Sequence, residues 1–174
     1  MDWSQIVEQH GPMVWRIARR LLNHESDAAD CFQKTFVSAW ELSKREPVGN
    51  WGPLLNRLAH ARALDGLRQR KRQARERIAI PNDGPSDSKT QSPLAAAGVS
   101  ELAQHLRAAL ADLDPRQAEV FCLASLEGLS YDEIAGQLRV TVNHVGVLLN
   151  RARTFLRTRL AAHRPSAVRE AKKE

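Results

Sequence analysis

Three side chains that lie close together in the sequence, Asn143, His144 and Val147, could read the edges of DNA bases. Asparagine and histidine each offer hydrogen-bonding groups, and valine offers an apolar contact for the methyl group of thymine. Arg151 and Arg153 follow at positions that suit contacts with phosphate groups. These residue types, in this order, favour a helix that enters the major groove of DNA.

The residues around these side chains predict two helices joined by a tight turn, over 129–153. Ser130 is predicted to cap the first helix, with Glu133 completing a capping box. Thr141 is predicted to cap the second helix. The inward positions of that helix are predicted to be Val142, Val145, Leu149, Ala152 and Leu156. An ordinary antiparallel helix pair has the same spacing, so this pattern alone leaves both readings open.

Positive charge is gathered in two blocks of the sequence. Residues 44–77 hold ten basic and three acidic side chains, and residues 149–174 hold eight basic and two acidic ones. The rest of the chain is acidic, although the net charge is +6. Solvated helix faces are one explanation. Beside the predicted helix pair, two basic blocks favour two contacts with a nucleic acid, whose phosphates they would neutralise.

Composition excludes several classes of protein. The chain has 43% hydrophobic residues, as folded proteins do, and no apolar run of about 20 residues, so we expect no membrane insertion and a cytoplasmic location. Cys31 and Cys122 lie far apart, and the six histidines lack metal-ligand spacing, so we expect reduced thiols and no metal or cofactor. Carboxylates are dispersed, and no nucleophile stands with a base, so no catalytic residue and no enzyme activity is expected.

The pattern of apolar residues predicts an all-α fold with two small helical domains joined by a flexible linker. The first domain covers 1–80 and the second covers 99–163. The linker over 81–98 holds three Pro, two Gly and three Ser, and a basic tail follows over 164–174. The helix-turn-helix belongs to the second domain.

Four helices are predicted in the first domain. The first covers about 3–10, and the second begins at Pro12. The third is capped by Ser26. A loop over 44–50 precedes the fourth, which covers about 51–77. In the second domain, a helix over about 99–113 precedes one that is capped by Asp114, with Gln117 completing the box. That helix is predicted to end near Gly128, where glycine suits a left-handed cap.

Three stretches of this sequence resemble motifs of one protein family, in the same order. They are DAADCFQKTFVSAW (27–40), WGPLLNRLAHARALDGLRQRKR (51–72) and LDPRQAEVFCLASLEGLSYDEIAGQL (113–138). They resemble the patterns DAEDLVQETFLRAW, WLxRIAxNxxxDxLRRRRR and LPPRQREVFLLRYLEGLSYEEIAELL of bacterial RNA polymerase sigma factors of the extracytoplasmic-function (ECF) group, in the sigma-70 family. The resemblance covers both domains and leaves out the linker and the tail after about residue 160.

The resemblance implies that the first domain docks on core RNA polymerase and captures the promoter −10 element, and that the second binds the −35 element of promoter DNA. The residues it implies for polymerase binding are Asp30, Gln33, Phe36 and Trp40. Those implied for the −10 element are Lys44, Arg45, Asn50, Trp51, Arg62, Asp65, Arg68 and Arg70. Those implied for the −35 element are Ser130, Tyr131, Thr141, Asn143, His144, Val147, Arg151 and Arg153.

Some of these residues have a second interpretation. The periodicity of Phe36 is that of a core residue, and Trp51 could be a core residue at the start of a helix. Asp65 and Arg68 could form only an (i, i+3) ion pair. An autonomous helix-turn-helix regulator is the alternative function, although the first domain resembles no ligand, receiver or dimerisation module.

The second helix of the predicted helix-turn-helix departs from the family. The family often has LGISxGTVKSRLHRAR where this chain has LRVTVNHVGVLLNRAR. Arg139 replaces the turn glycine, and His144, Gly146, Val147 and Leu148 replace side chains that face the groove. This helix is therefore expected to read a different sequence or to bind DNA less tightly. A competing view is that Asn143 and His144 only cap the helix, with Leu148 packed against another protein such as an anti-sigma factor.

Overall fold

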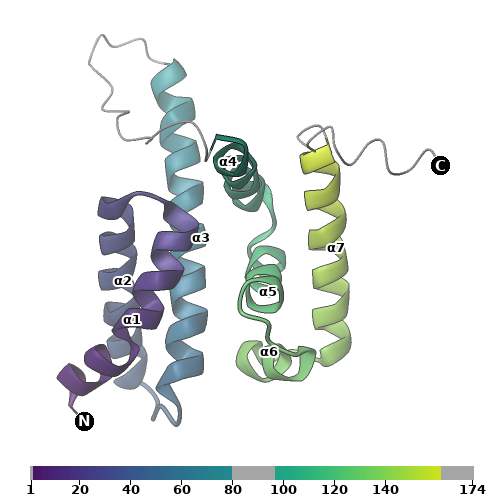
Figure 1. Cartoon of the computed structure of the whole chain (residues 1–174). Helices are drawn as coiled ribbons and strands as arrows, with labels where there is room; N and C mark the ends of the chain where they lie inside the picture. The colour runs from purple at the N-terminus through teal and green to yellow at the C-terminus, as the bar shows by residue number, and fades with distance from the viewer. Residues whose placement is uncertain (1, 80–96, 162–174) are drawn as a thin grey trace.

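The computed structural model describes residues 2–79 and 97–161, and within them the chain forms seven helices and no strand (Figure 1). This confirms the predicted all-α class. The predicted linker lies outside the described residues, apart from residues 97–98, which begin α4, and the basic tail lies outside them entirely.

The first half contains three helices rather than the predicted four. They are α1 (Trp3–Leu22), α2 (Glu25–Ser43) and α3 (Trp51–Ala79). The predicted break at residues 10–12 is wrong, because α1 continues through Pro12. Proline inside a helix costs about 3 kcal/mol. The apolar stripe from Ile6 to Leu22 is buried on both sides of Pro12, and this packing outweighs the local cost.

The predicted start of α2 at a Ser26 cap is also wrong. The helix begins at Glu25, and its N-cap residue His24 makes no side-chain capping bond. Asn23, just before it, adopts a left-handed conformation with φ 58° and ends α1 with a hydrogen bond from its N–H to the carbonyl of Arg19. Only Asn23 and His24 separate the two helices, so α2 begins before Ser26.

The second half contains α4 (Ala97–Asp112), α5 (Pro115–Ser125), α6 (Tyr131–Leu138) and α7 (Val142–Leu160). Asp114 caps α5 as predicted, because its carboxylate accepts hydrogen bonds from the backbone N–H groups of Arg116 and Gln117. The described bonds include no return bond from the Gln117 side chain. The helix ends at Ser125, slightly earlier than predicted, and Gly128 with φ 69° lets the chain turn into α6.

The two halves pack against each other along α3, which lies between α1 and α2 on one side and α4 and α5 on the other (Figure 1). One apolar core joins Ile17, Leu55 and Leu64 of the first half to Leu110 and Leu156 of the second. A second, smaller core lies under the helix-turn-helix. It is formed by Val120, Leu123, Ile134, Ala135, Leu138, Val145, Leu148 and Leu149.

Candidate nucleic-acid interface

The first helix of the helix-turn-helix, α6, begins with the predicted capping box. The backbone N–H of Ser130 donates to Oε2 of Glu133 at 2.8 Å, and the N–H of Glu133 donates to Oγ of Ser130 at 3.3 Å. The hydrogen bonds from Ser130 lower the pKa of Glu133, so this carboxylate stays ionised at neutral pH. The box fixes the start of an eight-residue helix that is too short to be stable alone.

The turn between α6 and α7 is strained at Arg139. This residue adopts the left-handed conformation with φ 54° and ψ 47°, and its N–H donates to the carbonyl of Ala135. A side chain in this conformation costs about 1–2 kcal/mol relative to the right-handed helix. The strain expected for an arginine at the family's glycine position is therefore present.

Thr141 caps α7 as predicted, because its hydroxyl accepts a hydrogen bond from the N–H of His144 at 3.2 Å. The inward positions Val145, Leu149, Ala152 and Leu156 are all buried, as predicted. The prediction for Val142 is wrong, because its side chain is 41% exposed. The first residue of α7 lies outside the small core, whose members from this helix are Val145, Leu148 and Leu149.

The outward face of α7 carries Asn143, His144 and Val147, all exposed. Leu148, predicted to face outward, is buried in the small core, so the competing view that it contacts a partner protein is wrong. Gly146 is partly exposed, and one ring atom of Tyr131 lies 3.6 Å from where a Cβ would stand, an ordinary van der Waals distance.

Basic side chains continue along the same helix. Arg151 and Arg153 are exposed, and neither has an ion-pair partner among the described residues. Guanidinium groups in this state keep all their donors for phosphate oxygens. The exposed part of α7 thus presents polar groups at its start and exposed cations one to two turns later.

The residues implied for polymerase binding lie on α2. Asp30, Gln33 and Trp40 are exposed, with Trp40 at 45%, and the ammonium of Lys44 lies 3.2 Å from the centre of the Trp40 ring. Phe36 is buried in the main core, with its ring centre 4.9 Å from that of Phe32, which confirms its interpretation as a core residue. Its buried side chain does not offer a surface for contact with polymerase.

Two exposed apolar side chains near this face were missed by the sequence analysis. Val37 is 52% exposed on α2 and Trp15 is 37% exposed on α1. Val37 stands three residues before Trp40, and that spacing places both on one side of the helix. The spacing was the available signal for Val37, whereas nothing in the sequence separates Trp15 from the buried apolar residues of α1.

The residues implied for the −10 element fall into two groups. Lys44, Arg45 and Asn50 are exposed in the loop over 44–50, where the Asn50 side chain accepts a hydrogen bond from the N–H of Gly52 at 3.1 Å. Trp51 is half-buried, with its ring edge against Trp3 at 5.1 Å between centroids. Its interpretation as a packing residue at the helix start is confirmed.

The second group lies on α3, where the cations are already paired. Arg62 and Arg68 each lie 3.3 Å from a carboxylate oxygen of Asp65, which confirms the (i, i+3) interpretation. Arg70 lies 3.1 Å from Asp27 of α2. Ion pairs of this exposure contribute little, about 0–1 kcal/mol, so DNA phosphates can replace the carboxylates.

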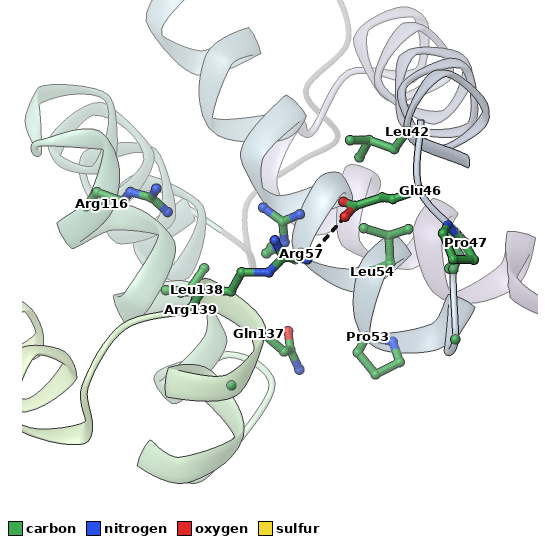
Figure 2. Close-up of a pocket in the computed structure, with 13 residues that line it drawn as sticks. Leu42, Glu46, Pro47, Pro53, Leu54, Arg57, Arg116, Gln137, Leu138 and Arg139 are labelled. Carbon is green, nitrogen blue, oxygen red and sulfur yellow. Dashed lines mark hydrogen bonds and ion pairs between the residues drawn. The ribbon is translucent and has the colours of Figure 1, made fainter. Parts of the chain in front are cut away.

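A cavity of about 440 Å³ lies between the loop over 44–50 and the turn of the helix-turn-helix (Figure 2). Pro53, Leu54 and Arg57 line it from α3, and Arg139 crosses it to reach Glu46, with 3.4 Å between Nη2 and Oε2. The two elements implied for the two promoter contacts are therefore neighbours in this structure.

Neither cysteine is poised for chemistry. Burial raises the pKa of Cys31 to about 11 and that of Cys122 to about 12, so both thiols are protonated at neutral pH. No group of three or more metal-ligating side chains is found in the described residues. None of the described helices is long and apolar enough to cross a membrane.

Comparisons with known proteins agree with this geometry. Residues 6–73 match the family model of sigma-70 region 2, and residues 103–156 match that of sigma-70 region 4. The chain is 32% identical over 171 residues to the ECF RNA polymerase sigma factor SigE of Mycolicibacterium smegmatis, covering 98% of this chain and 66% of that protein. It is 30% identical over 142 residues to the RNA polymerase sigma factor CarQ of Myxococcus xanthus, covering 79% of this chain and 76% of that protein.

A solved structure shares the fold. The sigma factor RpoE from Bartonella quintana, in complex with the anti-sigma factor NepR, matches with a TM-score of 0.53 at 22% identity, covering 94% of this chain and 99% of that one. From both family models in order and from relatives at 30% identity or more, the chain belongs to the sigma-70 family of RNA polymerase sigma factors, in its ECF group.

Proposed function

We propose that this protein binds core RNA polymerase and directs transcription initiation at specific promoters, with no catalysis of its own. Its first half recognises the −10 element and its second half the −35 element. The protein acts in the cytoplasm, where core polymerase and DNA are found.

The exposed face of α7 is the observation that carries this proposal. It presents Asn143, His144 and Val147 for base edges. Arg151 and Arg153, which have no ion-pair partner within residues 2–79 and 97–161, are available for phosphates. The polymerase contact rests on Asp30, Gln33 and Trp40, which share an exposed side of α2. Separate faces for protein and DNA suit a specificity subunit better than an autonomous regulator, which needs no polymerase docking surface.

Transcription with purified components tests the proposal. Core polymerase with this protein is expected to initiate at promoters selected from a random library, and neither component alone is expected to do so. An autonomous regulator would bind its DNA equally well with or without core polymerase and would not support initiation.

An anti-sigma factor is a candidate partner, because the RpoE structure contains one. Exposed Trp15, Val37 and Trp40 offer an apolar surface for such a protein on α1 and α2. Because this surface includes the proposed polymerase contact, an anti-sigma factor bound there would compete with core polymerase.

A further inference from the structure

Glu127, in the loop after α5, makes a dense polar contact with the first half of the chain. Its Oε1 lies 3.1 Å from Nη2 of Arg20 in α1 and 3.5 Å from Nε2 of His60 in α3. Its Oε2 accepts a hydrogen bond from Nδ2 of Asn56 at 3.4 Å. The Glu127 side chain is only 10% exposed, and that of His60 is fully buried. A single carboxylate of the second half thus contacts three side chains of the first.

The contact centres on an ion pair between the Glu127 carboxylate and the Arg20 guanidinium, with the His60 ring beside it. Nδ1 of His60 lies 2.9 Å from the carbonyl oxygen of Asn56, and because a carbonyl only accepts, Nδ1 carries the proton. Nε2 then faces Oε1 of Glu127 at 3.5 Å. The hydrogen bond with His60 is the largest cause that lowers the pKa of Glu127, so its carboxylate is ionised. Removing the carboxylate would leave polar groups of the first half, Asn56 and the buried His60 ring, without this partner, at a cost in free energy.

Other side chains tie the halves together at the surface proposed for the −10 element. The guanidinium of Arg68 reaches the carbonyl oxygen of Leu113 at 3.5 Å, and Lys71 forms an ion pair with Asp112. Arg139 reaches Glu46 on the far side of the cavity in Figure 2. In this arrangement, basic groups of α3 are engaged by the second half of the chain instead of by DNA.

This closed arrangement cannot read a whole promoter. The −10 and −35 elements lie about 25 base pairs apart, which is roughly 85 Å of duplex at 3.4 Å per base pair. In the closed chain, the loop over 44–50 and the turn before α7 are joined by an ion pair. The chain between α3 and α4, residues 80–96, can span up to about 60 Å when extended, so its length permits the halves to separate widely.

We propose that Glu127 is a latch that holds the protein closed, and that it must leave Arg20, Asn56 and His60 before core polymerase and both promoter elements are engaged. The latch itself follows from the contacts between the halves. Its role in polymerase and promoter binding rests on the proposed function.

The two buried cysteines allow opening to be distinguished from unfolding. Cys122 belongs to the apolar core that the halves share, close to Arg20 and Arg68 of the first half, so separation of the halves exposes it. Cys31 lies inside the first half, where its thiol approaches the carbonyl of Ala59 at 3.7 Å, so only unfolding exposes it. Labelling of Cys122 is followed in the full chain that carries Cys31→Ala, and labelling of Cys31 in the full chain that carries Cys122→Ala.

The test variant is Glu127→Gln, which keeps the shape of the side chain and removes its charge. The matched control is Glu101→Gln, which removes a charge from the same half but affects a partner within the same helix, His105. Labelling with a thiol reagent is expected to be about ten- to a hundredfold faster at Cys122 in Glu127→Gln, and unchanged at Cys31 and in the control. Equal Cys122 rates in Glu127→Gln and wild type, or equal acceleration at both cysteines, would overturn the latch.

Affinity for core polymerase provides the second measurement. If only the open form binds, the apparent dissociation constant falls by the factor by which the open fraction rises. Glu127→Gln is therefore expected to bind core polymerase more tightly than wild type and Glu101→Gln. Faster Cys122 labelling with unchanged affinity would overturn the role of the latch in polymerase binding. If no variant binds core polymerase while the labelling difference remains, the latch stands and the proposed function fails.

Discussion

Arg139 and Glu46 join the turn of the helix-turn-helix to the loop before α3 through one ion pair, with 3.4 Å between Nη2 and Oε2. The arginine is held in a left-handed conformation, and its side chain is 83% exposed. The backbone strain is therefore larger than any stabilisation that this exposed pair can return.

Replacing Arg139 by glycine is accordingly expected to raise the free energy of unfolding by about 1 kcal/mol, because glycine adopts positive φ without steric cost. Urea unfolding followed by circular dichroism measures this change. Asn23→Gly is the matched control at the other left-handed residue, where asparagine already tolerates the conformation and little change is expected. Destabilisation by Arg139→Gly would mean that the pair with Glu46 outweighs the strain.

Asp30→Ala combined with Gln33→Ala is expected to weaken binding of core polymerase about tenfold or more, because both side chains are exposed on the proposed docking face. The helical circular dichroism is expected to stay as in wild type. Phe36→Ala is the contrasting variant. It is expected to lower the unfolding temperature first, since that ring belongs to the core. Polymerase affinity equal to wild type in the double variant would exclude this face.

Replacing Arg151 and Arg153 by alanine is expected to weaken binding to −35 duplexes of any sequence to a similar extent. Each phosphate contact contributes about 0.9 to the slope of log K against log salt, so the slope should fall by about 1.8. Replacing Arg68 and Arg70 should instead impair opening at the −10 element and leave −35 duplex binding unchanged. Footprints that change in the same way in both variants would contradict two separate contacts.

Asn143→Ala and His144→Ala are expected to relax sequence preference at particular −35 positions, at a cost of about 1–3 kcal/mol for each lost base contact. Their salt dependence should stay close to that of wild type, because neither residue is assigned a phosphate. Selection from a library randomised at the −35 element, with the wild type and each variant, measures the effect. Identical selected sequences would show that these residues only shape the start of α7.

Burial raises the pKa of Glu119 in α5, where Arg116 lies 3.3 Å from its carboxylate. A carboxyl whose pKa is raised on folding contributes stability below its ordinary pKa of 4.5, and this stability is lost as pH rises through the raised value. Glu119→Gln is therefore expected to gain stability relative to wild type as pH increases from 4 to 7. A difference in unfolding free energy that is constant across this range would contradict the burial effect.

Local signals predicted much of the second half. Three predicted caps are present: the box of Ser130 and Glu133 at α6, Asp114 at α5 and Thr141 at α7. Each of these caps depends on residues that are neighbours in the sequence. The prediction of a Ser26 cap was wrong because of the tight turn at Asn23, and other predictions were wrong where packing with distant residues decides. Pro12 stays within a helix because residues on both sides of it in α1 are buried in the core, and Val142 is exposed because it lies outside the small core under the helix-turn-helix.

The contact between the halves gave no sequence signal. Glu127 resembles any polar residue at the end of a helix, and the three side chains it contacts are separated from it by 67 to 107 positions. Leu110 and Leu156 fit the apolar stripes of their own helices equally well whether they face their own half or the other. The sequence therefore predicted two domains and their candidate DNA face but not the surface by which the halves are joined.

The apolar core that runs through both halves also bears on solubility. When the halves part, side chains such as Leu110, Leu113 and Cys122 come into contact with water. An exposed apolar surface of this kind favours self-association unless another surface covers it. The open protein is therefore expected to remain monomeric only while polymerase or another partner covers that surface, and crowded solutions of latch variants should form aggregates at lower concentrations than the wild type.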